Sequence, residues 1–284
     1  MDTSKFLITG ANGQLGLALR AKYPDAKTTD QTQMDITDSN AVSTFDWSNV
    51  TTILNAAAYT DVDGAETPEG RVAAWKINAQ GPSNLAKIAR ERDILLIHLS
   101  SDYVFDGTQS PHLESEAPSP LSSYGASKAA GDMIVGVIPK YCLIRASWII
   151  GEGKNFVRTM LELGKQGVAP TVVHDQIGRL TFTSELVNAI DHLLKTNAAY
   201  GTYNVSNEGD PCSWADITRT IFKEANYDLF VTNATTAEYF AGKNGVAVRP
   251  LNSVLDLSKI KSTGFNSRNW HDDLKQYIKK ELGK

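Results

Sequence analysis

Cysteine is scarce in this sequence, and its scarcity excludes a disulfide-stapled fold. The chain of 284 residues has two cysteines, Cys142 and Cys212, and the residues around them show no disulfide framework and no metal-binding spacing. Both are expected to be plain thiols, buried or partly buried. Free thiols are typical of a reducing compartment, so a cytoplasmic location is expected.

Blocks of positive charge and long apolar runs are also missing. The formal net charge is −4 and no lysine- or arginine-rich block is present, which excludes a general nucleic-acid binder and a binder of anionic membranes. The first apolar run, residues 6–8, is too short for a signal peptide or a membrane span. These absences leave a soluble globular protein with one large domain or one and a half ordinary ones.

What the sequence does have is an alternation of short apolar runs with longer helical patterns. Uninterrupted apolar runs suit strands buried on both faces, as in a parallel sheet covered by helices. Strands are expected at residues 5–9, 51–56, 94–101 and 141–147, and helices at 14–22 and 66–92. This order predicts an α/β fold with a doubly wound parallel sheet of the Rossmann type.

A glycine-rich stretch, TGANGQLG (residues 9–16), joins the first expected strand to the first expected helix. Gly10 permits a tight turn, Gly13 lets the backbone approach a pyrophosphate, and Gly16 allows close helix-to-strand packing. The helix N-terminus offers free N–H groups and a positive dipole to an anion. The spacing is GxxGxxG and alone could mark a simple turn, but its position indicates a dinucleotide site. The cofactor-binding candidates in the turn are Gly10, Asn12, Gly13, Gln14, Leu15 and Gly16.

Further cofactor candidates follow the next strands. Asp30 comes 20 residues after Gly10, at the expected end of the second strand, where a carboxylate can accept the adenosine ribose hydroxyls. An ordinary loop aspartate is the alternative. A carboxylate here repels a 2′-phosphate, which favours NADH without deciding it, so the cofactor expected is NADH or NADPH. The residues expected beside the adenine or the pyrophosphate are Asp35, Ile36, Ala56, Ala57 and Ala58.

One tyrosine and one lysine stand four positions apart in SSYGASKAAGD (122–132), among very small side chains. This spacing places Tyr124 and Lys128 on one helical face, and small neighbours leave room for a bulky ligand there. A free phenol titrates near pH 10. A nearby ammonium, joined by the positive ring of an oxidised nicotinamide, is expected to lower the pKa of the phenol. Lys128 can also donate hydrogen bonds to the nicotinamide ribose. Alone, YxxxK often means a solvated helix face.

These motifs occur in the order found in the extended branch of the short-chain dehydrogenase/reductase superfamily, and the chain resembles that branch. TGxxGxxG, the asparagine of KINAQG (76–81), a serine after the fourth strand and YxxxK all match. Several longer segments look like those of the dTDP-4-dehydrorhamnose reductases. They are NAAAYTDVDGAE (55–66), SSDYVFDG (100–107), SPLSSYGASKAAGD (119–132), IRASWIIGEGKNFV (144–157), DQIGRLT (175–181) and VRP (248–250). The resemblance is weakest after about residue 225.

The resemblance implies a reaction and a role for each matching residue. The reaction is transfer of a hydride from NAD(P)H to the C4 ketone of dTDP-4-dehydro-L-rhamnose, giving dTDP-L-rhamnose. Tyr124 would donate the proton, Lys128 would be its electrostatic partner, and Ser101, where the family usually has threonine, would hydrogen-bond the C4 oxygen. The substrate-binding residues implied are Ser101, Asp102, Tyr103, Trp148, Val62 and Asp63. Asn78 matches a structural asparagine of the superfamily, or only ties a helix to a strand.

The regular alternation of expected strands and helices changes after about Trp148. Helices are expected at 155–166, 183–195, 213–225 and 270–282, and strands at 171–174 and 201–207. Residues 1–148 are expected to form a dinucleotide-binding domain, with segments returning to it near 171–207. Residues 149–170 and 208–284 are expected to form a smaller substrate-binding lobe. Arg179 or Arg249 there could hold a diphosphate bidentately or form surface ion pairs.

Some relatives dimerise through a metal ion held by acidic side chains, one of them on the helix after the glycine turn. Here that helix has no acid, Ala18 occupies the relevant face, and Glu185 alone is not a site. No metal is therefore expected, and the protein is expected to be a monomer or a homodimer. The partner expected is a small nucleotide-sugar substrate, with no nucleic acid and no membrane.

Two alternatives to this reductase remain. The first is a regulatory subunit that binds NAD(P) without turnover, against which the intact Ser101, Tyr124 and Lys128 speak. The second is another sugar-nucleotide 4-ketoreductase, epimerase or dehydratase. Dehydratases of this branch need an acid pair beside the catalytic Ser or Thr, and Asp102 followed by Tyr103 leaves that pair incomplete.

Overall fold

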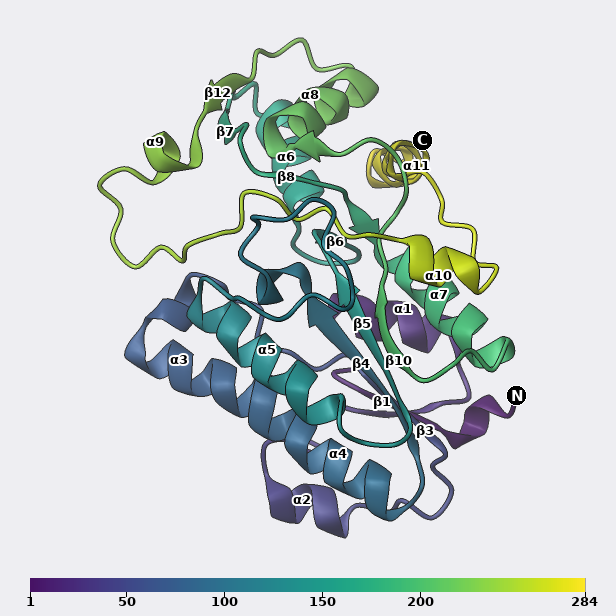
Figure 1. Ribbon diagram of the computed structural model, residues 1–284. Coiled ribbons are helices and arrows are strands. Elements are labelled where there is room, and N and C mark those ends of the chain that lie inside the picture. The colour runs from purple at the N-terminus through teal and green to yellow at the C-terminus, as the bar shows by residue number, and fades with distance from the viewer. Residues whose placement is uncertain (284) are drawn as a thin grey trace.

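The computed structural model describes residues 1–283. Within them, six parallel strands form one sheet in the order β10-β5-β4-β3-β1-β2 (Figure 1). The strands are β1 (Phe6–Thr9), β2 (Lys27–Thr29), β3 (Thr52–Asn55), β4 (Leu95–Ser101), β5 (Tyr141–Ala146) and β10 (Gly201–Asn204). The chain moves outward from β1 to β2 on one side and from β3 to β10 on the other. The order therefore reverses between β1 and β3, where Rossmann-type sheets bind ligands. The expected fold class is confirmed.

Helices cover both faces of the sheet (Figure 1). One face carries α2 (Ser39–Thr44), α3 (Pro68–Trp75), α4 (Gly81–Glu91) and α5 (Ser123–Val135), and the other carries α1 (Gln14–Lys22), α7 (Thr183–Lys195) and α10 (Ser258–Ser262). Because the strands are buried on both sides, each face has its own apolar core. Leu85 and Val135 pack into the first, and Leu19, Leu186 and Ile260 into the second.

A third apolar core belongs to a smaller lobe, drawn at the top of Figure 1. Its main helices are α6 (Phe156–Lys165), α8 (Trp214–Ala225) and α11 (Trp270–Glu281). Its short elements are β6 (Ile149–Ile150), β7 (Thr171–Val173), β8 (Ile177–Gly178), β9 (Thr181–Phe182), β11 (Cys212–Ser213), β12 (Thr232–Ala234) and α9 (Thr236–Phe240). Amphipathic helices and paired short strands thus enclose a core separate from those of the sheet.

The lobe differs from its expected boundaries in two places. Residues 171–182, expected among the segments returning to the sheet, form β7, β8 and β9, which pair with β12, β11 and β6, and Val172, Leu180 and Phe182 pack into the lobe's core. Conversely, Leu255, Ile260 and Phe265, expected in the lobe, pack against the sheet. The reason is that a short strand pairs with whichever neighbour the tertiary fold provides. We propose that the chain has two lobes, with the segment that contains β7 in the smaller lobe and residues 255–265 in the lobe that contains the sheet.

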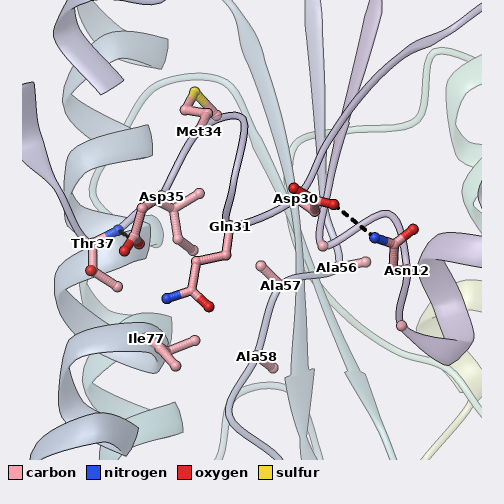
Figure 2. A pocket seen from close by; sticks show the side chains of 13 residues that line it. Asn12, Asp30, Gln31, Met34, Asp35, Thr37, Ala56, Ala57, Ala58 and Ile77 are labelled. Carbon is pink, nitrogen blue, oxygen red and sulfur yellow. Dashed lines mark hydrogen bonds between the residues drawn. The ribbon is translucent and has the colours of Figure 1, made fainter. Parts of the chain in front are cut away.

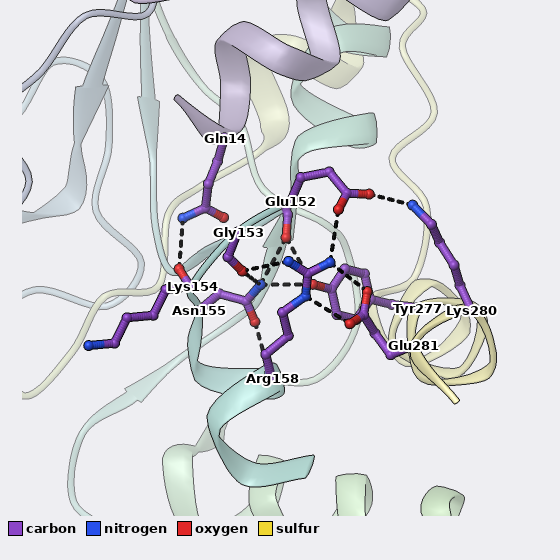
Figure 3. Close-up of polar contacts among 10 residues, drawn as sticks. Gln14, Glu152, Gly153, Lys154, Asn155, Arg158, Tyr277, Lys280 and Glu281 are labelled. Atoms are coloured by element: carbon purple, nitrogen blue, oxygen red, sulfur yellow. Dashed lines mark hydrogen bonds and ion pairs between the residues drawn. The ribbon is translucent and has the colours of Figure 1, made fainter. Parts of the chain in front are cut away.

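A polar cluster fastens the lobe together where α6 meets α11 (Figure 3). The Arg158 guanidinium donates from Nε and Nη2 to the two carboxylate oxygens of Glu281, both at 2.8 Å, and Nη2 also contacts Glu152 at 2.8 Å. Asn155 donates to the Tyr277 hydroxyl at 2.8 Å. Gln14, at the start of α1, donates to the Lys154 carbonyl at 3.5 Å. The loop before α6 therefore lies against the glycine turn.

The helical stretch expected at 66–92 is present but interrupted. A π-helical turn at Lys76–Gln80 separates α3 from α4 and contains the buried Asn78. The Asn78 amide accepts from Tyr59 N at 2.9 Å and donates to Tyr59 O at 3.1 Å and to Ser127 Oγ at 3.0 Å. Asn78 thus ties this turn to the loop after β3 and to α5. Single π-turns inside helices are frequent at functional sites.

The two cysteines are free thiols, as expected. Cys142 is buried on β5 and Cys212 is partly buried on β11. Burial raises the pKa of the Cys142 thiol to about 11 and that of Cys212 to about 12, so both stay protonated near neutral pH. Across residues 1–283, no helix combines the length and the apolar character needed to cross a membrane.

Candidate active site

The glycine turn lies at the carboxyl edge of the sheet, between β1 and α1. Gly10 has φ +66°, and a Cβ there would lie 2.4 Å from Ala57 N, so a side chain does not fit. A Cβ on Gly16 would lie 2.2 Å from the Gly10 carbonyl oxygen, which shows how closely α1 approaches the turn. For Gly13 the nearest atom would be 3.5 Å away. Gly13 therefore leaves open space in front of the α1 N-terminus.

A cavity of about 230 Å³ opens beside this turn (Figure 2). Nine of the expected cofactor residues line it: Gly10, Asn12, Gly13, Asp30, Asp35, Ile36, Ala56, Ala57 and Ala58. Four further lining residues were not expected from the sequence: Gln31, Met34, Thr37 and Ile77. Three of them could have been inferred from their neighbours in sequence, because Gln31 follows Asp30, and Met34 and Thr37 flank the pair expected beside the adenine.

Five residues expected to contact the cofactor lie outside this lining: Tyr124 and Lys128, described below, and three residues of the first helix. The Gln14 side chain turns toward Lys154 (Figure 3). Leu15 is buried in the core under the sheet, where its side chain supports α1. Gly16 faces the Gly10 carbonyl. A direct contact of these three residues with a cofactor stays a prediction.

Asp30 stands at the rim of the cavity, immediately after β2. Its Oδ2 accepts from Asn12 Nδ2 at 2.9 Å, and its Oδ1 accepts from Thr32 N at 2.9 Å and Thr32 Oγ1 at 2.6 Å. The hydrogen bonds from Thr32 hold the pKa of Asp30 below its usual value. The Asn12 amide oxygen in turn accepts from Arg20 at 3.2 Å. A fixed, ionised carboxylate therefore faces the cavity.

A buried polar row runs across three neighbouring strands behind the cavity. Thr9 Oγ1 donates to Asn55 Oδ1 at 2.7 Å, and Ala57 N donates to the same oxygen at 3.2 Å. The Asn55 amide nitrogen must therefore face His98 Nδ1, 2.8 Å away, which acts as acceptor. His98 is then neutral, with its proton on Nε2, and burial lowers its pKa well below the usual value. This row holds the loop after β3 at a set distance from the glycine turn.

Tyr124 and Lys128 lie on one face of α5, as their spacing predicts, and Ser101 ends the neighbouring β4. Tyr124 is 9% exposed and Lys128 only 2%. Lys128 Nζ donates to the Leu99 carbonyl at 2.6 Å, and the Ser101 side chain lies near the Tyr124 hydroxyl and donates to Asp102 Oδ1 at 3.0 Å. Because β1, β3 and β4 are adjacent and parallel, their carboxyl ends bring this group to the same edge as the cavity.

The titration of the pair differs from the expectation. Burial raises the pKa of the Tyr124 phenol to about 12, and the nearby Ser101 side chain only partly opposes this. Burial also lowers the pKa of Lys128 to about 8. The protein's own groups thus raise the pKa of the phenol, because loss of hydration disfavours the phenolate more than its neighbours stabilise it. Tyr124 is a protonated donor near neutral pH.

The other expected substrate residues surround this pair unequally. Tyr103 packs edge-on against Tyr124, with ring centroids 5.5 Å apart, and the partly buried Val62 packs against the same small apolar cluster. Asp102 is 2% exposed and accepts from Ser101 Oγ at 3.0 Å, and burial raises its pKa to about 6. Trp148 has φ +46° and stacks on Trp214 at 3.9 Å in the lobe. Asp102 is therefore the most enclosed of the set.

Both arginines proposed for a diphosphate have partners within the chain. Arg249 donates from Nη2 to both carboxylate oxygens of Asp63 at 2.8 Å, and its guanidinium lies near Tyr103. Arg179 donates to the Leu255 carbonyl. The Asp63–Arg249 pair connects the segment before α10 to the loop after β3, which lies beside Tyr124. An ion pair within the chain, the second of the expected alternatives, is what Arg249 forms.

Acidic residues do not converge on a metal site in the part of the chain that is described. Residues 1–283 contain no cluster of three or more His, Cys, Asp or Glu side chains with metal-binding geometry. Glu185 is buried at the start of α7, where it accepts from Arg268 N at 3.0 Å. Burial raises its pKa to about 7.

The parallel sheet, the glycine turn at its carboxyl edge and the Tyr124–Lys128 pair define the class of this protein. It is a Rossmann-type α/β protein of the short-chain dehydrogenase/reductase kind. The family model described as "RmlD substrate binding domain" matches residues 4–282. The chain belongs to this family.

Relatives of known name agree over nearly the whole chain. The dTDP-4-dehydrorhamnose reductase of Aggregatibacter actinomycetemcomitans is 37% identical, over 96% of this chain and 97% of its own length. The crystal structure of a dTDP-4-dehydrorhamnose reductase from Clostridium acetobutylicum superimposes with a TM-score of 0.90 at 37% identity, covering 98% of this chain and 99% of that one. A Bacillus anthracis dTDP-4-dehydrorhamnose reductase in complex with NADP gives 0.88 at 35% identity, covering 97% and 98%. The resemblance stated from the sequence motifs is confirmed.

Proposed function

We propose that the protein reduces the C4 ketone of dTDP-4-dehydro-L-rhamnose to dTDP-L-rhamnose with NADH or NADPH. The observation that carries the proposal is the buried Ser101–Tyr124–Lys128 group at the sheet edge that also bears the glycine turn and its cavity. Membership of a family with named dTDP-4-dehydrorhamnose reductases supports the choice of substrate. The residue roles below follow from chemistry and geometry.

The residues that line the cavity beside the glycine turn suit the adenosine and pyrophosphate part of a dinucleotide. The position of Gly13 leaves the backbone N–H groups of the α1 N-terminus accessible to a pyrophosphate. The ionised Asp30 can accept the hydroxyls of an adenosine ribose, and Ile36, Met34 and Ile77 offer apolar surface to an adenine. Ala56 to Ala58 let the backbone lie close to the ligand. When bound, the reduced nicotinamide supplies the hydride that adds to the C4 carbon.

Tyr124 protonates the oxygen of that carbon. Its raised pKa keeps it protonated, and donation leaves a phenolate that the Lys128 ammonium and the Ser101 hydroxyl can stabilise. Ser101 can also hydrogen-bond the ketone oxygen and so orient it toward the phenol. Donation by a positioned acid contributes about 10²–10⁴-fold to the rate. Tyr103, Val62, Asp63 and Trp148 are proposed to contact the sugar, and the enclosed Asp102 to orient Ser101.

The direct test is oxidation of NADH or NADPH, followed at 340 nm, with a panel of 4-keto nucleotide sugars. We expect turnover of dTDP-4-dehydro-L-rhamnose and identification of dTDP-L-rhamnose as product by mass spectrometry and NMR. Turnover of a different 4-keto sugar alone would refute the substrate. Cofactor binding without turnover of any ketone would instead identify a regulatory subunit.

Replacing Tyr124 by Phe tests the proton donor. We expect turnover to fall by about 10²–10⁴-fold while cofactor affinity, measured by titration calorimetry, stays unchanged. Tyr23→Phe is the matched control, because Tyr23 is also buried and its hydroxyl contacts Asp191, on the face of the sheet that carries α1 and α7. Unchanged turnover in Tyr124→Phe would remove the phenol from the mechanism.

A further inference from the structure

A third charged residue continues the face of α5 that carries Tyr124 and Lys128. Asp132 follows Lys128 by four residues, one helical turn on, and is 5% exposed. The face therefore bears a phenol, an ammonium and a carboxylate in succession, all buried. No described side chain donates to Asp132 Oδ1, although that atom is buried. A buried carboxylate with a spare oxygen is costly unless its charge has a use.

The position of Asp132 is fixed from the neighbouring strand. Arg145, on β5, donates from Nε to Asp132 Oδ2 at 3.0 Å, and both side chains are at most 6% exposed. Arg145 has further supports, since Nη1 donates to the Glu114 carbonyl at 3.1 Å and the guanidinium lies 5.0 Å from the Phe105 ring centroid. Arg145 thus fixes the carboxylate one helical turn from Lys128, without a direct ion pair between Asp132 and Lys128. Burial raises the pKa of Asp132, and the charge of Arg145 opposes that rise.

Lys128 needs a nearby negative charge because its ammonium group is buried and is therefore poorly hydrated. The other groups that face it are Tyr124 on its own helix, and His98 and the Leu99 carbonyl on β4. The phenol is protonated and His98 is neutral, so neither balances the ammonium. Burial lowers the pKa of Lys128 to about 8, and the charge of Asp132 opposes that lowering. Loss of the carboxylate charge would therefore lower the pKa of Lys128 further.

We propose that Asp132, held by Arg145, is the counter-charge that keeps Lys128 an ammonium, and so is a positioning residue for the Tyr124–Lys128 pair. The use of that charge in catalysis rests on the function proposed above, whereas the charge state of Lys128 does not. Two measurements therefore separate the two ideas.

The first measurement titrates Lys128 itself in the full-length protein. Labelling with [ε-¹³C]lysine gives one NMR signal per lysine, and the signal missing in Lys128→Arg identifies Lys128. In Asp132→Asn we expect its titration midpoint to fall by about 1 pH unit, since loss of a neighbouring opposite charge disfavours the ammonium. Asp132→Glu should keep the midpoint near that of the wild type. An unmoved midpoint in a folded Asp132→Asn overturns the proposal.

Two further variants guard against misinterpretation. Asp132→Asn leaves a buried guanidinium unpaired, so the double variant Asp132→Asn with Arg145→Gln replaces the ion pair by an amide pair and should show the same fall. Asp191→Asn is the matched control, because Asp191 also pairs with a lysine four residues along its helix, Lys195, at 2.8 Å. Its loss should leave the Lys128 midpoint in place.

The second measurement is the pH profile of ketone reduction. Loss of the ammonium as pH rises should move the alkaline limb of kcat in Asp132→Asn to lower pH by the same interval as the NMR midpoint. A purely structural role predicts a lower melting temperature with an unmoved midpoint and limb, and that result would refute a positioning role. If no sugar is reduced by any variant, the function fails and the NMR titration still decides this proposal.

Discussion

Replacing Gly16 by alanine should damage the fold, although alanine is the better helix former. A Cβ at this position would lie 2.2 Å from the Gly10 carbonyl oxygen and 2.8 Å from two backbone atoms of Ala11. These are backbone contacts, so α1 must move away from the turn. Overpacking of this kind costs about 1–3 kcal/mol, and the severity of the overlap favours the upper end. The gain in helix propensity returns about 1 kcal/mol, which leaves a net loss of about 2 kcal/mol.

Gly13→Ala is the matched control for this prediction. A Cβ there meets nothing closer than 3.5 Å, and the backbone at φ −78° and ψ 171° suits any residue. Its stability should stay within about 0.5 kcal/mol of the wild type. Its affinity for NADPH should fall, because the methyl group occupies the space in front of the α1 N-terminus.

Urea denaturation followed by tryptophan fluorescence gives the stability, and titration calorimetry gives the affinity. The two variants should differ in what they lose: Gly16→Ala should lose stability, and Gly13→Ala should lose mainly cofactor affinity. The reasoning is refuted if Gly16→Ala is as stable as the wild type, or if Gly13→Ala loses as much stability as Gly16→Ala.

Two more predictions concern buried polar groups. Asn55→Ala would leave Thr9 Oγ1, Ala57 N and His98 Nδ1 without their partner, so a loss of about 3 kcal/mol or more in urea is expected; a loss below 1 kcal/mol would contradict the polar row. The pKa of Glu185 is raised from 4.5 to about 7, so the folded chain binds an extra proton and the stability this group contributes is lost as pH rises through that window. Relative to wild type, Glu185→Gln should gain about 3 kcal/mol between pH 4.5 and pH 7.5 in denaturation experiments, and a constant difference would contradict it.

Much of the fold could be predicted because its signals are local. Strands β1, β4 and β5 are apolar runs bounded by turn residues, and helices α1 and α7 begin and end at the residues expected. The partner of β7 could not be predicted, since three residues of strand pair with whichever edge the folded lobe presents. The π-turn at Lys76–Gln80 was also missed, because a shift of one residue in the apolar spacing is too small to tell from the ordinary irregularity of a helical pattern.

The candidate site was likewise predictable where its signals are local and not where they depend on the tertiary fold. The glycine turn and the four-residue spacing of Tyr124 and Lys128 indicated chemistry because geometry follows directly from spacing in a turn or a helix. The pKa of Tyr124 was beyond reach, since it depends on how much water the tertiary fold removes. Met34 and Ile77 line the cavity through the path of a loop and a π-turn, which periodicity does not encode.

The π-turn holds one residue more than an α-helix has in the same length. Deleting a single residue from Lys76–Gln80 should therefore leave a regular helix in which α4 keeps its orientation, at the expense of the contacts that Asn78 makes with Tyr59 and Ser127. One residue of an α-helix corresponds to a rotation of about 100°, so the same deletion within α4 would turn every later side chain by that angle and expose its apolar stripe to solvent. Deletions scanned through residues 68–91 should thus be better tolerated in the π-turn than in α4.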